Sequence, residues 1–162
     1  MIPLHILFER VNPRTPGKIN APMFAYQCLY GSLPPNGLSG RGASHEEVIW
    51  HGIGVDKAIP IKALNDLDSI PEIELRSSCQ GSDKDRPTFL IFRLKSHDVD
   101  QSLKLAKLLS KYDDMNSCSG IGNEGLPRII VTSKLWYDMD QIKFKKWWLN
   151  IAPRIKKCLR DI

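Results

Sequence analysis

The spacing of hydrophobic positions separates an irregular N-terminal section, residues 1–51, from a regularly patterned remainder, residues 52–162. Five prolines and five glycines between residues 12 and 45 interrupt every apolar run there. We therefore expect only short elements in this section: ILFERV and APMFAYQCLY can each supply a strand or a helical turn, and residues 46–50 a short strand.

From residue 52 onward, apolar positions recur with helical or strand spacing. Ile59, Ala63 and Leu67 lie four residues apart, which predicts a helix. Asp56 is expected to cap this helix, whose first turns tolerate the missing N–H of Pro60. The strand IEL that follows is expected to run into a polar loop.

The second half of the patterned section is expected to hold two strands and two helices. TFLIFRL is the most strand-like stretch, and Asp98 is placed to cap the helix after it. A long loop over residues 113–127 and a short buried strand over residues 128–133 follow. The last helix is expected to begin near Asp138, and Pro153 should kink or split it.

This order of elements predicts an α/β fold: a single-domain two-layer sandwich with a mixed sheet. Ser-Cys-Gln-Gly (78–81) and Ser-Cys-Ser-Gly (117–120) both lead into buried strands, which suggests a possible internal duplication. A length of 162 residues, of which 42% are hydrophobic and 25% charged, fits one domain.

The composition also indicates in which compartment of the cell the protein is expected to work. No apolar run approaches the roughly 18 residues that span a bilayer, and the first residues lack the basic segment of a signal peptide. The four cysteines form no C-x-x-C pair, so they are expected to be reduced thiols. We therefore predict a cytoplasmic protein with no membrane partner and no metal.

The net charge of +5 is concentrated near the C-terminus. Residues 141–162 contain seven Lys or Arg against one acid, whereas the remaining chain has 16 basic and 17 acidic residues. Concentrated positive charge is typical of a surface that binds a polyanion. The candidate nucleic-acid contacts are Lys145, Lys146, Lys156 and Lys157. The alternative is that these lysines form the solvated face of an amphipathic helix.

Two tryptophans, Trp147 and Trp148, lie beside these lysines. Aromatic side chains next to cations can provide a stacking platform for nucleic-acid bases. The alternative is that Trp148 belongs to the core and that Trp147 is half-buried.

A polar segment at the end of the predicted IEL strand is the main candidate for binding a ligand. Its small side chains and a glycine could leave several N–H and hydroxyl groups free to converge on an oxyanion or a carboxylate. The candidate residues are Arg76, Ser77, Ser78, Cys79, Gln80 and Gly81. The alternative is a polar turn with Cys79 buried in the core.

The series of motifs along residues 52–133 resembles the tRNA wybutosine-synthesising protein 3 family. The motifs, in order, are Gly-Val-Asp at 54–56, Ser-Ser-Cys-x-Gly at 77–81, Ser-His-Asp at 96–98, Asn-Ser-x-Ser-Gly-Ile at 116–121 and Thr-Ser at 132–133. The family hallmark is Ser-Ser-Cys-Ser/Ala-Gly-Arg, and Ser82 stands here in place of its arginine.

The resemblance implies methylation of a guanine-derived tRNA base with S-adenosylmethionine as cofactor, without a Rossmann fold. It implies a cleft built from the Ser-Ser-Cys-x-Gly segment and faced by His97 and by the segment containing Ser117, Ser119 and Gly120. His97 and Asp56 would then be the catalytic residues that handle protons.

Other interpretations remain open from the sequence. The same residues could sequester a small nucleotide without catalysis, or the N-terminal section could dock a protein partner. Cys79 and His97 could form a nucleophile and base. A zinc site composed of Cys79, Cys118 and His97 is conceivable but lacks any local ligand pair.

Overall fold

The computed structural model describes residues 6–8, 21–34, 45–122 and 124–162. Its centre is a five-stranded sheet with the order β1-β6-β7-β5-β4. The strands are β1 (Ile6–Phe8), β4 (Ile73–Cys79), β5 (Thr88–Leu94), β6 (Asn116–Ile121) and β7 (Pro127–Ser133). β1 pairs with β6 in parallel and the other neighbours are antiparallel, so the expected mixed sheet is confirmed.

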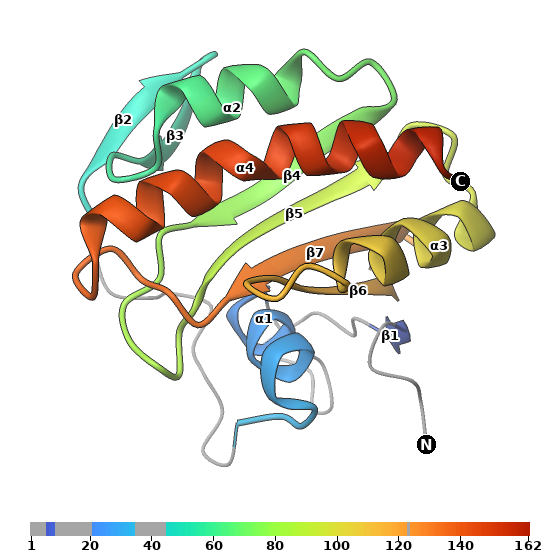
Figure 1. Ribbon diagram of the computed structural model, residues 1–162, viewed down its shortest axis with the longest axis horizontal. Coiled ribbons are helices and arrows are strands. Elements are labelled where there is room, and N and C mark those ends of the chain that lie inside the picture. The colour runs from blue at the N-terminus through green and yellow to red at the C-terminus, as the bar shows by residue number, and fades with distance from the viewer. Residues whose placement is uncertain (1–5, 9–20, 35–44, 123) are drawn as a thin grey trace.

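Three helices form the second layer of the α/β sandwich on one face of this sheet, as Figure 1 shows. They are α2 (Ile61–Asp68), α3 (Val99–Leu109) and α4 (Gln141–Arg160). Apolar side chains of these helices pack on strand residues such as Leu90, Phe92 and Val131. The expected two-layer arrangement is therefore confirmed.

The opposite face of the sheet carries a smaller apolar cluster under α1 (Ala21–Tyr30). Phe24, Ala25 and Cys28 of α1 pack there against strand residues Phe89, Ile91, Cys118 and Ile130. The segment 21–30, for which the sequence allows either a strand or a helical turn, is thus a helix.

The order helix–strand–strand occurs twice, as α2-β4-β5 and as α3-β6-β7. In both units the two strands form an antiparallel pair, and β5 lies beside β7 at the centre. The two Ser-Cys-x-Gly motifs fall on β4 and β6 at different positions, because Cys79 ends β4 whereas Cys118 lies inside β6. The elements repeat, but the motifs are not equivalent in register.

A separate hairpin of β2 (Glu47–Trp50) and β3 (Ile53–Asp56) precedes α2. The two turn residues, His51 and Gly52, have φ angles of 49° and 77°. Two successive positive φ angles match the twist of a two-residue hairpin turn. The strand expected at residues 46–50 is therefore confirmed.

Two helix-terminus predictions are corrected. Asp56 does not cap α2: it is the last residue of β3, and Pro60 is the residue that precedes the helix, with no side-chain cap. Pro153 does not split α4, which is one continuous helix. Asp98 does cap α3, because its carboxylate accepts a hydrogen bond from the Gln101 amide.

Two expected loops are partly strands. β4 continues through Ser77 and Ser78 to Cys79 after a bulge, and β6 occupies residues 116–121 of the expected long loop. Both stretches consist of small and polar residues, so backbone pairing rather than hydrophobic patterning defines them. Within the described part of the chain, no helix has the length and apolar character of a membrane span.

Candidate functional site

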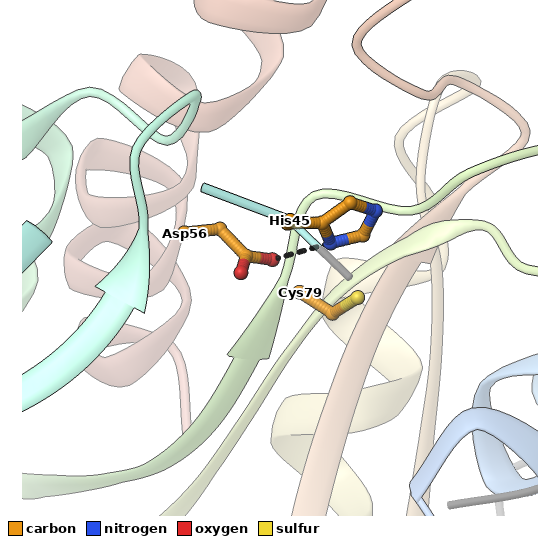
Figure 2. Close-up of side chains that lie close together, drawn as sticks. All are labelled: His45, Asp56 and Cys79. Carbon is orange, nitrogen blue, oxygen red and sulfur yellow. Dashed lines mark hydrogen bonds and ion pairs between the residues drawn. The ribbon is translucent and has the colours of Figure 1, made fainter. Parts of the chain in front are cut away.

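The ends of β3 and β4 meet at a cluster of polar side chains. The Asp56 carboxylate accepts a hydrogen bond from the Gln80 amide at 2.8 Å. Its Oδ2 also lies 3.2 Å from Nδ1 of His45, and the other ring nitrogen of His45 lies 3.3 Å from Oγ of Ser82. Figure 2 shows the imidazole and the carboxylate facing each other, with the Cys79 side chain beside them. A continuous polar chain therefore runs from Asp56 through His45 to Ser82.

Cys79 ends β4 at the edge of this cluster. Its Sγ accepts a hydrogen bond from the Gly81 amide at 3.4 Å. Burial raises the pKa of the Cys79 thiol to about 11. The thiol is therefore protonated at neutral pH, which makes it a poor nucleophile.

Three consecutive amides at the end of this segment, those of Gln80, Gly81 and Ser82, are not available to an oxyanion, because each already donates within the protein. The amides of Gln80 and Gly81 donate to Asp56 and Cys79, and the Ser82 amide donates to the Arg86 carbonyl at 2.9 Å. These donors cannot converge on an external anion. What the turn offers to a ligand is instead its side chains, among them that of Gln80.

The structure divides the six candidate residues 76–81 between two places. Arg76, Ser77 and Ser78 line a hollow of about 320 Å³ under the β2–β3 hairpin, together with Trp50 and Leu64. Arg76 also forms an ion pair with Glu74. Cys79 packs against the apolar cluster under α1, and its Sγ also lies at the Asp56 cluster. Of the six candidates, Gln80 and Gly81 are the other two that lie at the Asp56 cluster.

His97 does not belong to this site. Cys79 pairs with Phe89 near the start of β5, whereas His97 follows the far end of that strand and is exposed. The length of β5 separates them by roughly 20 Å. The expected cleft facing His97, the Cys79–His97 pair and the composite zinc site are therefore all wrong.

Ser117, Ser119 and Gly120 are also remote from Cys79. They are buried in β6, which β7 and β5 separate from β4. The Ser119 hydroxyl donates to the Arg128 carbonyl, and the Ser117 hydroxyl has no partner among the described residues. Three strand spacings of about 4.8 Å place β6 roughly 14 Å from β4, so the structure does not bring these residues together with Cys79.

A cleft of about 560 Å³ adjoins the Asp56 cluster. It is lined on one side by His45 and Gln80 and on the other by Tyr137 and Lys145, with Lys57 also at its wall. The expected nucleic-acid residue Lys145 therefore faces the same space as the expected ligand-binding residue Gln80. Glu46 and Asp138 add carboxylates to the lining.

The remaining basic candidates lie on the exposed face of α4, namely Lys146, Lys156 and Lys157. Trp147 and Trp148 are 2% and 0% exposed, so they cannot stack on bases. Their indole N–H groups donate to the Asp114 carbonyl and to Oγ1 of Thr88. Both are core residues, which corrects the expectation that Trp147 is half-buried.

Several polar residues of the site are not among the residues predicted from the sequence: Glu46, Lys57, Ser82, Tyr137, Asp138 and above all His45. His45 lies in the irregular N-terminal section, and no residue near it in the sequence has the spacing of a metal-ligand pair or a catalytic pair. Ser82 stands out in the sequence only as a departure from the family arginine. Only the folded chain, in which the end of β3 lies against the turn after β4, brings these side chains together.

Comparison with protein-family models, with curated proteins and with solved structures finds no match to this chain.

Proposed function

We propose that the cleft beside the Asp56 cluster binds a nucleotide-like ligand, such as a modified tRNA base with its phosphate, and that α4 holds the attached RNA. The observation that carries this proposal is the common lining of the cleft by Lys145 of α4 and by His45 and Gln80. One cleft thus joins the basic helix to the turn after β4.

The chemistry of the lining suits a nucleotide. Lys57 and Lys145 supply cations for a phosphate, and carboxylates such as Asp138 can accept hydrogen bonds from ribose hydroxyls. Tyr137 offers an aromatic surface, and its ring contacts Phe144 edge-on at 5.6 Å. A volume of about 560 Å³ lies within the range of small-molecule pockets.

Methylation from S-adenosylmethionine is the enzymatic form of this proposal. The cofactor would supply an electrophilic methyl group. Its amino-acid part carries one positive and one negative charge, and the cleft is lined by both lysines and carboxylates that can pair with them. The implied base His97 is at the far end of β5, so no proton-transfer step is assigned to it. Of the two predicted catalytic residues, Asp56 is the one beside the cleft. Non-catalytic sequestration uses the same contacts and is the alternative.

A thermal-shift panel tests the proposal, with S-adenosylmethionine, S-adenosylhomocysteine and linear and cyclic nucleotides as ligands. We expect at least one of them to raise the melting temperature by several degrees when present at about 100 times its dissociation constant. Recovery of the nucleotide chemically intact would favour sequestration, whereas methyl transfer to tRNA would favour the enzyme. No shift with any ligand would contradict the proposal.

Lys145→Ala and Lys146→Ala form a matched pair for this test. Both remove one exposed lysine from α4, but only Lys145 lines the cleft. We expect Lys145→Ala to weaken binding of the free nucleotide about tenfold, which corresponds to one lost charge-assisted contact. Lys146→Ala should bind the nucleotide as the unaltered chain does. Equal effects of the two changes on nucleotide affinity would contradict binding of the nucleotide in this cleft.

A further inference from the structure

Histidine, cysteine and carboxylate side chains come together at one place in the described residues. The ligand atoms of His45, Asp56 and Cys79 all lie within 4.8 Å of one another. Figure 2 shows that they come from three separate segments: the approach to β2, the end of β3 and the end of β4. Nothing in the binding of a nucleotide requires this combination of side chains.

We propose that His45, Asp56 and Cys79 bind one divalent transition-metal ion, with zinc as the best match. An imidazole nitrogen and a thiolate sulfur favour zinc over calcium and magnesium, which prefer oxygen ligands alone. One carboxylate oxygen is compatible with zinc as a third ligand.

The distances fit an ion of this size. Nδ1 of His45 and Oδ2 of Asp56 are 3.2 Å apart. A tetrahedral zinc ion with bonds of about 2.0–2.1 Å separates its nitrogen and oxygen ligands by roughly 3.3 Å. Sγ of Cys79 is within 4.8 Å of both atoms, and a zinc–sulfur bond of about 2.3 Å places it roughly 3.6 Å from each, so it approaches by at most about 1.2 Å. Rotation of one cysteine side chain can supply such a movement.

The turn after β4 gives each ligand a hydrogen-bond partner. The Gln80 amide donates to Asp56, the Gly81 amide donates to Sγ of Cys79, and Ser82 Oγ lies beside the second ring nitrogen of His45. In the metal-bound form, Nε2 of His45 carries the proton and donates to Ser82, so that Nδ1 presents its lone pair to the ion. Partners of this kind orient metal ligands and fix the histidine tautomer.

The direction of these hydrogen bonds favours a cation over an anion. Three consecutive amides of the turn are consumed within the protein, and two of them donate to the proposed ligand atoms. The three ligand atoms of His45, Asp56 and Cys79 present lone pairs on nitrogen, oxygen and sulfur. An anion at the three ligand atoms would meet none of these amides, whereas a metal ion would meet three electron-pair donors.

Binding also balances charge and protons. The Cys79 thiol releases one proton to solvent and becomes a thiolate, while His45 binds as the neutral imidazole. The thiolate and the Asp56 carboxylate then neutralise the two positive charges of the ion. No oxidation or reduction is involved.

Three protein ligands leave a fourth position for water or for an oxygen atom of a bound molecule. This arrangement is typical of catalytic zinc sites, whereas structural sites use four protein ligands. His45 also lines the cleft, so the metal would lie at the edge of the proposed nucleotide site. If the metal binds, His45 and Asp56 act as its ligands and not as proton acceptors.

Titration of the metal-free full-length chain with Co²⁺, in the absence of nucleotide, tests this proposal independently of the proposed function. We expect binding of one ion per chain, with the visible absorption of tetrahedral cobalt and a thiolate-to-cobalt charge-transfer band. Cys79→Ala should remove the charge-transfer band. His45→Asn and Asp56→Asn should weaken binding by at least about 100-fold, since loss of a supporting partner alone costs roughly 10–100-fold.

Matched controls are Cys158→Ala, which removes another free thiol, and His97→Asn, which changes an exposed histidine. Both should bind cobalt as the unaltered chain does. Failure of the unaltered chain to bind cobalt or zinc, or equal binding by the Cys79→Ala variant, would overturn the proposal.

A measurement on the unaltered chain guards against variants that do not fold. Zinc should slow alkylation of Cys79, read by mass spectrometry of the peptide that contains it, while alkylation of Cys158 stays the same. Equal labelling of Cys79 with and without zinc would overturn the proposal.

Discussion

At the scale of single residues, Gly81 is the residue on which the geometry of the site depends. Its φ of 77° belongs to the left-handed region. A Cβ atom there would lie 2.6 Å from the Arg86 carbonyl oxygen and 2.6 Å from the Thr88 amide nitrogen. Only glycine lets the turn after β4 pass this close to residues 86–88, in the conformation in which its amide donates to Sγ of Cys79.

Gly81→Ala is therefore expected to destabilise the protein by clearly more than the ~1–2 kcal/mol of a left-handed alanine. Gly125→Ala is the matched control, because Gly125 has the same φ of 77° but a Cβ atom there would meet no atom within 4 Å. Urea unfolding of the two variants measures the difference. If both variants lose the same free energy of unfolding, Gly81 does not lie as close to Arg86 and Thr88 as described here.

Residues of the site differ in how far the sequence reveals them. Asp56, Cys79, Gln80 and Gly81 follow from motifs, since they lie at or beside the ends of two strands that the motifs mark. His45 carries no such mark, because no motif contains it and its partners Asp56 and Ser82 are 11 and 37 residues away. The motif series also includes His97, which lies at the opposite end of the sheet from Cys79. Motifs give the order of residues along the chain, but they do not show at which end of the sheet each residue lies.

At the scale of elements, α4 combines a buried face with a basic one. Phe144, Trp148 and Ile151 are fully buried, whereas Lys145 and Lys156 are exposed. These two lysines are eleven residues apart, which is about three helical turns and roughly 16 Å along one side of the helix. Such a row of cations suits the backbone of a nucleic acid.

If RNA lies along α4, Lys145→Ala combined with Lys156→Ala should weaken RNA binding. The change should also reduce the slope of log affinity against log salt by roughly 1.4, since each phosphate contact on a single strand contributes about 0.7. Fluorescence anisotropy with labelled tRNA at several salt concentrations measures both quantities.

The control for this prediction is Lys104→Ala combined with Lys107→Ala, two exposed lysines on α3. It removes the same charge from a different helix and should leave the salt slope unchanged. If both double variants weaken binding equally, the attraction is due to net charge and α4 is only a solvated face.

Elements with strong apolar patterning can be predicted from the sequence, whereas elements held by backbone pairing cannot. TFLIFRL and the helices after Asp98 and near Asp138 follow from hydrophobic spacing. β6 is made of small and polar residues, and it is a strand because β1 and β7 pair with it on both sides. Polar composition alone therefore predicts a loop where the sheet imposes a strand.

At the scale of the whole molecule, the fold brings three distant segments to one end of the sheet. The β2–β3 hairpin supplies Asp56, the end of β4 supplies Cys79, and the segment just before the hairpin supplies His45. The α/β sandwich can be predicted from the sequence because that fold follows from the order of elements. The site requires knowledge of strand order and register, which are set by long-range pairing.

The most direct test of this account is a crystal structure of the chain grown with zinc, with diffraction data collected on both sides of the zinc absorption edge. We expect one anomalous peak within bonding distance of His45, Asp56 and Cys79, at the edge of the cleft that Lys145 lines. No peak at these three residues, or His45 positioned away from Asp56, would contradict it.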